Sequence, residues 1–229
     1  MKKTTLSAVV VAVIAASIGG AFAYRSHART AEIDSMRPAV NLTSAYVSQV
    51  LQADTKPSSM TFGEFFSKTN QALEEIDKKE IELKSQDIKY AVDERATALA
   101  YMASAQEAIR GESALYHKKS DVKFAFSQTD DAIAEMTSAS TSDNPYSFKY
   151  ARERADKALE RAKKSASELT DAQNDLVTSL KAVRAASENA TQTFASKDTP
   201  AADIDAALKA NAPAPASGTA APKTADAAH

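Results

Sequence analysis

The C-terminal half of the chain carries the most regular hydrophobic pattern, in which apolar or small residues recur at alternating steps of four and three. The positions of this stripe are Ala155, Leu159, Ala162, Ala166, Leu169, Gln173, Leu176, Leu180, Val183, Ser187, Ala190 and Phe194. A 3.5-residue repeat sustained over nearly six heptads predicts a helix that winds around a second helix in a left-handed supercoil.

A second stripe runs through the segment 87–138. Its positions are Ile88, Val92, Arg95, Leu99, Met102, Gln106 and Ile109, followed beyond Gly111 by Leu115, Val122, Phe126, Ile133 and Met136. No proline interrupts this segment, so we expect one long helix. The change of phase at Gly111 indicates a kink or a local overwinding there rather than a helix end.

The segments 87–138 and 145–196 match in length, because each contains 52 residues. As helices they would span about 78 Å at 1.5 Å per residue. The connection 139–144 is short enough to make them antiparallel neighbours. In that register Ile109 lies near Leu176, and apolar positions meet along the whole seam.

The start of the second of these helices is marked by a turn sequence. Asp143 or Asn144 can accept the free backbone N–H groups of a new helix, and Pro145 suits its first turn. The segment 139–144 is therefore the clearest boundary in the chain.

Two shorter helices are predicted before the hairpin. The segment 61–84 carries the stripe Phe62, Phe66, Thr69, Leu73, Ile76, Glu80 and Leu83, and its outer face has the i,i+4 pairs Glu74–Lys78, Glu75–Lys79 and Glu80–Lys84. An amphipathic segment with Leu42, Tyr46, Val47, Val50 and Leu51 on one face precedes it.

The phase of the pattern changes at residues 85–87. A stutter in a continuous helix or a tight turn capped by Asp87 would both explain the change, and we favour the turn. It folds the segment 61–84 back onto a stripe of small residues, with Leu73 near Ala98 and Phe66 near Ala105. The other members of this stripe are Ala91 and Ala108.

These elements together predict an all-α fold. We expect an elongated antiparallel helical hairpin or coiled coil that is thickened to a three- or four-helix bundle at one end. The helical domain would cover residues 41–196.

The N-terminus predicts export. Lys2 and Lys3 precede an apolar run from Leu6 to Ile18, and Ala21-Phe22-Ala23 has the small-x-small form of a signal-peptidase site. We interpret 1–23 as a signal peptide. An uncleaved signal anchor is the alternative, since 5–24 approaches the length that spans a bilayer. Both place the rest of the chain outside the cytoplasm, in the periplasm or cell envelope of a bacterium.

Two segments show no clear periodicity. Residues 24–40 contain Met36-Arg37-Pro38 and are expected to form a tether. Residues 197–229 hold thirteen Ala and four Pro in 33 positions, a composition that buries too little apolar surface to fold. We therefore expect a disordered tail there, although the segment 201–210 has the composition of a short helix.

Composition and charge exclude several classes of protein. The chain has 229 residues, 44% of them hydrophobic, no Cys and only five Gly. Disulfide scaffolds, thiolate metal sites and cysteine nucleophiles are therefore excluded. The formal charge of −2 gives no reason to expect a nucleic-acid partner.

The search for chemistry yields no catalytic, cofactor-binding or metal-ligating set. The chain has no Glu-x-x-His pair, no H-E-x-x-H motif and no phosphate-binding glycine loop. His117, Glu112 and Asp121 could form a metal or acid–base group by their residue types. We favour a solvated His117 beside Lys118 and Lys119. The acidic pairs Asp130-Asp131 and Glu74-Glu75 are interpreted as surface charges.

Two further polar features are candidates for interaction. Arg95 and Gln106 occupy seam positions, where they either set the register or lie at the edge of the seam. Basic residues are frequent at the start of the last long helix, and interspersed acids favour an ordinary solvated flank. They are Arg152, Arg154, Lys157, Arg161, Lys163 and Lys164.

The sequence therefore predicts a non-enzymatic helical scaffold or adaptor without cofactors. Its partner would be another protein or a second copy, bound through the coiled-coil faces. A helical protein that binds lipid or a membrane surface through an apolar face is the alternative.

Overall fold

The chain folds into helices and connections only, in the parts that the structure describes. The computed structural model describes residues 3–55, 61–141, 145–196 and 199–212, and for 3–22, 54–55 and Pro145 it describes the backbone alone. The helices are α1 (Lys3–Thr55), α2 (Phe62–Ser85), α3 (Val92–Ser140), α4 (Pro145–Phe194) and α5 (Ala201–Ala210). The predicted all-α fold is confirmed.

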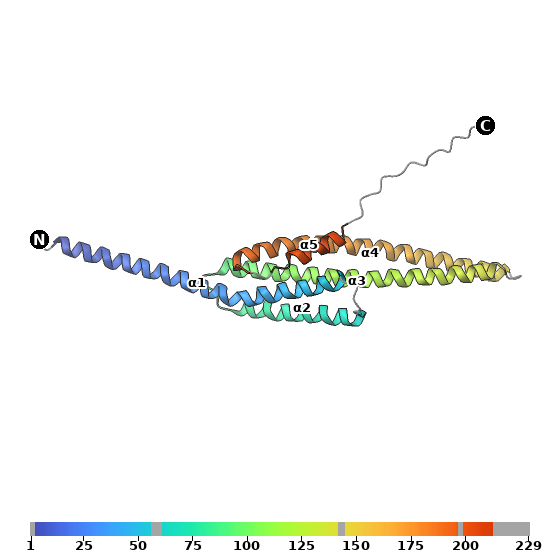
Figure 1. The fold of residues 1–229 in the computed structure, drawn as a ribbon, viewed down its shortest axis with the longest axis horizontal. Coiled ribbons are helices and arrows are strands. Elements are labelled where there is room, and N and C mark those ends of the chain that lie inside the picture. The colour runs from blue at the N-terminus through green and yellow to red at the C-terminus, as the bar shows by residue number, and fades with distance from the viewer. Residues whose placement is uncertain (1–2, 56–60, 142–144, 197–198, 213–229) are drawn as a thin grey trace, which may run out of the picture.

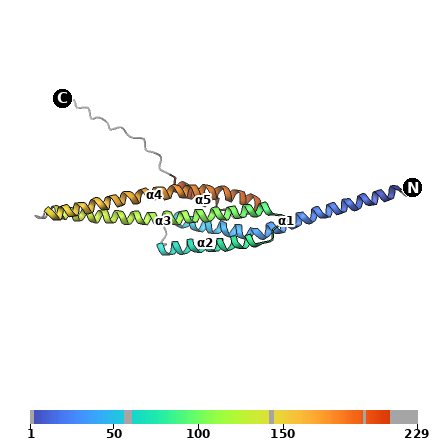
Figure 2. The same cartoon turned by 180° about the vertical axis from the view of Figure 1, so that it is seen from behind.

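An antiparallel hairpin of α3 and α4 forms the spine of an elongated molecule (Figure 1). The C-terminal half of α1, together with α2 and α5, packs around the end where α3 begins and α4 finishes. The N-terminal part of α1 projects beyond that end, and the tip of the hairpin extends alone in the opposite direction (Figure 2). The expected hairpin, thickened to a bundle at one end, is therefore the observed architecture.

The core of the bundle is apolar and draws residues from all five helices. Its largest fully buried side chains are Met36, Leu51, Phe65, Ile76, Leu83, Tyr101, Met102, Ile109, Leu115, Leu176, Leu180 and Phe194. Burying each aliphatic side chain of this size contributes about 1.5–3 kcal/mol. The only hydroxyl in this group belongs to Tyr101, whose Oη lies 3.0 Å from Oγ of Ser44 in α1.

The seam between α3 and α4 has close to the predicted register. Gly111 lies against Leu176, and a Cβ atom added at Gly111 would come within 3.3 Å of Cδ1 of Leu176. The sequence predicts Ile109 as the neighbour of Leu176, and Ile109 lies two residues before Gly111 in α3. Helix α3 continues through Gly111 without ending, so glycine serves here to let α4 approach the backbone of α3 closely.

Helix α2 begins with the hydrogen bonds of a capping box. The Thr61 hydroxyl accepts from the Glu64 backbone, and the Glu64 carboxylate accepts from the Thr61 N–H. The predicted pairs Glu74–Lys78 and Glu80–Lys84 form. In place of the pair Glu75–Lys79, Lys78 also binds Glu75 and Lys79 binds Glu82.

The predicted register of α2 on α3 is wrong. Phe66 lies 4.6 Å from the His117 ring instead of near Ala105, and Phe65 stacks on Tyr116 with 4.3 Å between ring centroids. The physical reason is the connection between the helices, which occupies 86–91 and is longer than the tight turn expected at 85–87. The longer connection lets α2 slide along α3 until its aromatic residues meet Tyr116.

The break between two helices near 85–87 is confirmed, as the connection 86–91, but Asp87 does not cap α3. Asp87 is exposed and pairs with Lys89. The Glu32 carboxylate, from α1, accepts hydrogen bonds from the backbone N–H groups of Lys89, Tyr90 and Ala91 at 3.1, 2.8 and 2.8 Å. A residue far away in sequence therefore satisfies the free donors before α3.

The expected tether at 24–40 is instead part of α1, and Met36, Ala39 and Val40 lie in the core. Pro38 is inside the helix on its exposed side, where the missing N–H and the ring are tolerated best. The apolar stripe extends through this segment, but the polar Thr43 interrupts it in sequence. The Thr43 hydroxyl donates to the Ala39 carbonyl at 2.8 Å and is thereby satisfied.

The expected tail at 197–229 is also partly wrong. Helix α5 forms at Ala201–Ala210 and buries Ile204 and Ala207 in the core. Polar contacts hold it in its middle and at its C-terminal end: Arg184 binds Asp205 at 2.9 Å, and Gln173 donates to the Asn211 carbonyl at 3.1 Å. Residues 213–229 lie outside the described residues, and their expected disorder stays a prediction.

The predicted leader, 1–23, lies almost wholly outside the residues with described side chains. Its cleavage or retention therefore stays a prediction. Among the residues whose side chains are described, no helix is long and apolar enough to cross a membrane.

Candidate functional site

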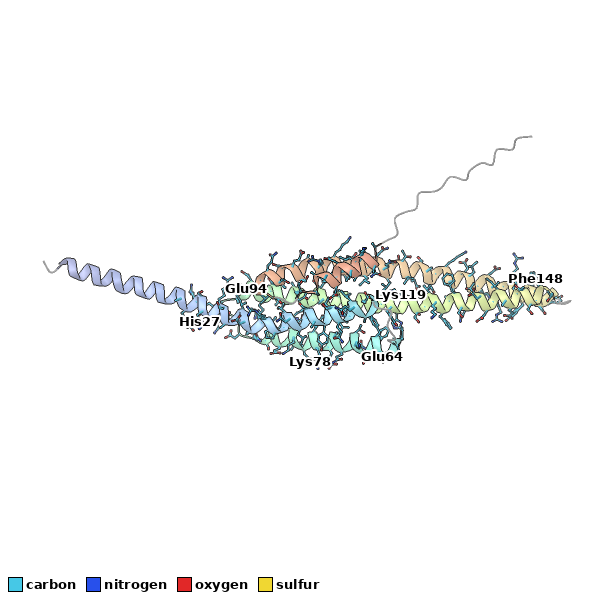
Figure 3. The ribbon with its side chains drawn as sticks, in the orientation of Figure 1. His27, Glu64, Lys78, Glu94, Lys119 and Phe148 are labelled. Carbon is cyan, nitrogen blue, oxygen red and sulfur yellow. The ribbon has the colours of Figure 1, made fainter. Side chains whose placement is uncertain are left out.

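The tip half of the hairpin stands apart from the bundle. The bundle ends at α2, where Phe62 lies 5.5 Å from Tyr116, and at α5, where Asn211 meets Gln173. Beyond these levels, residues 120–140 of α3 and 145–168 of α4 form a two-helix extension that we call the arm. Figure 3 shows Phe148 near the tip of the arm, far from Glu94 and His27 at the other end of the molecule.

The seam of the arm is built from small residues. Its buried positions are Ala125, Thr129 and Ala132 in α3 and Ala151, Ala155, Ala158 and Ala162 in α4. The Thr129 hydroxyl donates to the Ala125 carbonyl at 2.9 Å, so this seam leaves it satisfied. Such small side chains let two helices approach closely but bury little apolar area per residue.

The structure corrects the predicted stripe in the arm. The sequence placed Phe126, Ile133 and Leu159 in the seam, but their exposed fractions are 52%, 47% and 44%. The residues immediately before them, Ala125, Ala132 and Ala158, fill the seam instead. Because alanines bring the helices close together, no room remains between them for the larger side chains.

These displaced side chains share one face of the arm, which we call the apolar face. Successive residues of a helix are about 100° apart, so a residue one position after a seam residue projects to one flank. In an antiparallel pair this flank lies on the same side for both helices. The apolar face therefore combines Phe126 and Ile133 of α3 with Leu159 of α4.

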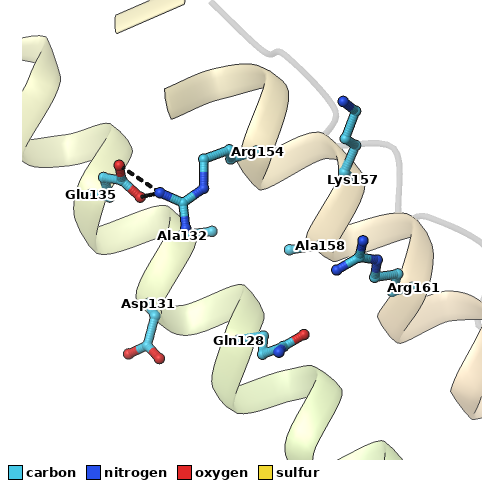
Figure 4. Close-up of a pocket in the computed structure, with 8 residues that line it drawn as sticks. All are labelled: Gln128, Asp131, Ala132, Glu135, Arg154, Lys157, Ala158 and Arg161. Atoms are coloured by element: carbon cyan, nitrogen blue, oxygen red, sulfur yellow. Dashed lines mark hydrogen bonds and ion pairs between the residues drawn. The ribbon is translucent and has the colours of Figure 1, made fainter. Parts of the chain in front are cut away.

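The opposite flank is a polar groove, which we call the charged face (Figure 4). Its lining residues are Gln128, Asp131, Ala132 and Glu135 of α3 and Arg154, Lys157, Ala158 and Arg161 of α4. Arg154 reaches across the groove, and its Nη1 lies 2.7 and 2.9 Å from the two carboxylate oxygens of Glu135. This pair lies across the hairpin and strengthens its register.

A second charged cluster closes the base of the arm. Nζ of Lys118 lies 2.6 Å from the Glu168 carboxylate and 3.8 Å from that of Asp121. The hydrogen bond from Lys118 holds the pKa of Glu168 below its usual value, and the same bond raises the pKa of Lys118. Both groups are partly exposed, so we interpret them as a surface ion pair that joins α3 to α4.

The two helices of the arm carry opposite net charge. Residues 120–140 hold four acidic and one basic residue, whereas residues 145–168 hold seven basic and four acidic residues. The α3 side is therefore acidic and the α4 side basic. The predicted basic start of the last long helix belongs to this surface, where Arg154, Lys157 and Arg161 border the charged face.

The structure does not assemble the metal or acid–base group drawn from His117, Glu112 and Asp121. His117 is exposed and packs edge-on against the ring of Phe62 at 5.1 Å, whereas Glu112 is buried within α3. Over the part of the chain that the structure describes, no three His, Asp or Glu residues converge as a metal site would require.

The other polar candidates have structural surroundings. Asp130, Asp131 and Glu74 are exposed. Gln106 is buried and donates to Glu80 of α2 at 3.2 Å, so it belongs to the α2–α3 contact and not to the exposed edge of the seam. Arg95 is half-buried and donates to the Gln86 carbonyl at 3.2 Å.

A second surface, which the sequence analysis did not predict, lies where α1 enters the bundle. Tyr24 meets Tyr90 edge-on with 6.5 Å between ring centroids, and Tyr90 lines a groove with Arg25 and Arg29. Arg29 also forms an ion pair with the mostly buried Glu94 of α3. Aromatic and basic side chains therefore gather directly after the predicted leader.

Comparison with protein families, with curated proteins and with solved structures gives no match to this chain. The interpretation of its function therefore depends on the arm and its surroundings.

Proposed function

We propose that this protein is an exported or membrane-anchored bacterial cell-envelope protein that acts as a helical scaffold or adaptor, without catalysis. Its interaction element is the arm, and its bundle holds the arm at a fixed distance from the N-terminus. The partner is a protein that binds the helical faces of the arm.

The observation that carries the proposal is the exposure of large apolar side chains on the arm. Phe126 and Ile133 project from α3 beside an alanine seam, and no described element of the chain covers them. In a helix pair that has no binding partner, these residues would be expected in the seam, where they would bury more apolar area. Large exposed apolar residues on one face of a helix pair are typical of a surface that binds another protein.

Export is supported by the sequence of the leader. The apolar run and the Ala21-Phe22-Ala23 site precede the bundle, and α1 connects the two without a loop. A retained leader would therefore hold the bundle rigidly at the membrane, whereas cleavage after Ala23 would release it. Mass measurement of the N-terminus of the protein isolated from envelope fractions separates these two forms.

Shortening the arm tests the scaffold function. Deleting 122–135 and 154–167 removes two heptads from each helix, and the Glu135–Arg154 pairing shows that the deleted segments face one another. The bundle core lies outside the deletions. After chemical cross-linking in living cells, the full-length chain is expected in a complex larger than its own 24.4 kDa.

The shortened chain should fold with a cooperative thermal transition but should not enter that complex. Unchanged complex formation by the shortened, folded chain would contradict the proposal. A deletion of one heptad from α3 alone, 122–128, is the control that disrupts the register instead of the length.

A membrane-surface function is the second candidate, and the surface around Tyr90 favours it. Tyr side chains and arginines are typical of the interface between a bilayer and water. Flotation with anionic and neutral liposomes tests this function. Binding to anionic vesicles that is lost in Arg25→Ala/Arg29→Ala would support it, and equal recovery with both vesicle types would contradict it.

A further inference from the structure

The apolar face of the arm carries charged residues of its own, distinct from those of the charged face. The apolar face is formed by the positions that follow the seam residues. The residues of the charged face precede them, as Asp131 precedes Ala132 and Lys157 precedes Ala158. The large apolar residues therefore have a different set of charged neighbours. The exposed charged residues on their flank of the arm are Lys123, Asp130, Lys149, Arg152, Asp156 and Lys163.

The three large apolar side chains of this face form one patch. The ion pair between Arg154 of α4 and Glu135 of α3 shows which residues of the two helices lie at the same level along the arm. Leu159 of α4 then lies between the levels of Phe126 and Ile133 of α3. A helix that packs against both α3 and α4 would therefore contact all three side chains within about two turns of its own length.

Basic residues lie at both ends of this patch, and acidic residues lie between them. The basic residues are Lys123 and Lys163 toward the bundle and Lys149 and Arg152 toward the tip. The acidic residues are Asp130 and Asp156. Lys163 also binds Glu160 at 3.0 Å, but both side chains are more than half exposed, so this pair contributes little and can be exchanged for another. The flank thus has an excess of basic charge.

This distribution of charge restricts the kind of partner that fits. A second copy would present the same excess of basic charge, so two such faces would repel each other. A lipid surface would leave the carboxylates of Asp130 and Asp156 close to apolar chains without cations to pair with them. A helix of another protein can provide apolar residues for the patch, acids for its two ends and a base for its middle, as flanking residues do in coiled coils.

We propose that the apolar face binds an acidic amphipathic helix of another protein, which lies along the arm and makes a three-helix coiled coil with α3 and α4. Phe126, Ile133 and Leu159 contact the apolar stripe of this helix, and the basic residues at the ends of the patch pair with its flanking acids. This inference rests on the proposed function, because it states the chemistry of the partner that binds the arm.

Two synthetic helical peptides test the chemistry of the partner. Both consist of three heptads with Leu at the apolar positions, and the flanking positions are Glu in one peptide and Lys in the other. Fluorescence anisotropy of the labelled peptides with the purified full-length chain should give a Kd for the Glu peptide that is lower by roughly tenfold or more. Added salt should raise this Kd, because opposite charges are screened.

Substitutions on the two faces of the arm show where the peptide binds. Phe126→Ser is compared with Phe124→Ser, which changes an exposed phenylalanine on the charged face. Lys123→Glu is compared with Lys157→Glu, which reverses one charge on the charged face. The Kd of the Glu peptide should rise roughly tenfold in Phe126→Ser and roughly threefold in Lys123→Glu. The two controls should change it by less than about twofold, and all four variants should keep the thermal transition of the wild type.

Photo-cross-linking in living cells extends the test to the natural partner. A photoreactive phenylalanine analogue replaces Leu159 on the apolar face in one full-length chain and Lys157 on the charged face in the matched control. Mass spectrometry of the cross-linked peptides identifies the segment that was captured. The expected product at Leu159 joins the arm to a helical segment of another protein with more acidic than basic residues. No such product is expected at Lys157.

Several results would overturn the inference. Equal affinity for the two peptides, or binding of neither, would exclude an acidic helix as the partner. A product at Leu159 that joins two copies of this chain would assign the face to a second copy, and liposome binding that is lost in Phe126→Ser would assign it to a membrane. An arm-dependent complex in cells that Phe126→Ser and Lys123→Glu leave intact would refute only this inference. A complex that forms without the arm would refute the proposed function itself.

Discussion

The Glu32 carboxylate accepts a hydrogen bond from the backbone N–H of Ala91 at 2.8 Å, across 59 residues of sequence. Partial desolvation alone would raise the pKa of Glu32, but this bond and those from Lys89 and Tyr90 outweigh it. The pKa therefore lies below its usual value of 4.5. Because these donors precede α3, Glu32 fixes the start of that helix to α1.

Glu32→Ala should therefore lower the free energy of unfolding by about 1 kcal/mol, the usual effect of losing a helix cap. A carboxylate with a lowered folded-state pKa stabilises the protein above its unfolded-state pKa and loses this effect as the pH falls through the folded value. The difference between wild type and Glu32→Ala should thus be complete at pH 7 and shrink below pH 4.5. Urea denaturation at several pH values measures it, and Asp34→Ala, at an exposed site on α1, is the control. A difference that does not change with pH would contradict this role.

Met36 tests whether the segment 24–40 is part of the fold. It is fully buried, and Met36→Ala should lower the free energy of unfolding by about 2–5 kcal/mol, as is usual for large-to-small core substitutions. Met136, which is only half-buried in the arm, offers the matched comparison, and its substitution by Ala should have a clearly smaller effect. Equal effects in urea denaturation would show that α1 contributes no more to stability than the arm does.

The buried hydroxyls of Ser44 and Tyr101 form a pair that a double-mutant cycle can measure. Burial raises the pKa of Tyr101 to about 12, while the bond to Ser44 lowers it. Ser44→Ala leaves a buried phenol without this partner and should lower the free energy of unfolding by about 1–3 kcal/mol. Adding Tyr101→Phe removes the second polar group, so the double variant should be less destabilised than the sum of the single variants. Additive effects would show that the two hydroxyls do not interact.

Gly63 and Gly111 should respond in opposite ways to a larger side chain. No atom lies within 4 Å of a Cβ added at Gly63, whereas one added at Gly111 meets Leu176 at 3.3 Å. Gly63→Ala should raise the free energy of unfolding by up to about 1 kcal/mol through helix propensity. Gly111→Leu should lower it by about 1–3 kcal/mol through overpacking, and Gly63→Leu controls for side-chain size. Thermal melts with matched urea titrations distinguish these results.

The hairpin could be predicted from sequence because its signals are local and repeated. The heptads of α4, the matched segment lengths and the Asn144-Pro145 boundary all indicate the same pair of helices. The packing of α2 could not be predicted in the same way, since its register depends on how the connection 86–91 folds against Glu32. That contact joins two distant parts of the chain, and no local pattern reports it.

The remaining differences have two physical origins. In α1 and α5 small and polar residues weaken the hydrophobic pattern, so the sequence does not show that these segments are buried. Thr43 and alanines lie there in the folded core together with Val40 and Ile204. In the arm the opposite holds, because Phe126 and Ile133 are large apolar residues and yet lie outside the seam. The hydrophobicity of Phe126 and Ile133 indicated that they favour an apolar contact. It did not predict that alanines would fill the seam between α3 and α4 and leave these larger side chains outside it.

Helix α1 runs from Lys3 to Thr55 without a break, and this continuity links the angular position of the arm to a count of residues. Each residue added to a helix rotates everything after it by about 100° around the helix axis. One alanine inserted between Tyr24 and Arg25 would therefore swing the arm more than a quarter turn relative to the N-terminal segment, while seven would return it to within about 20° of its original azimuth. The number of residues in α1 therefore sets the direction in which the arm points relative to the N-terminal segment.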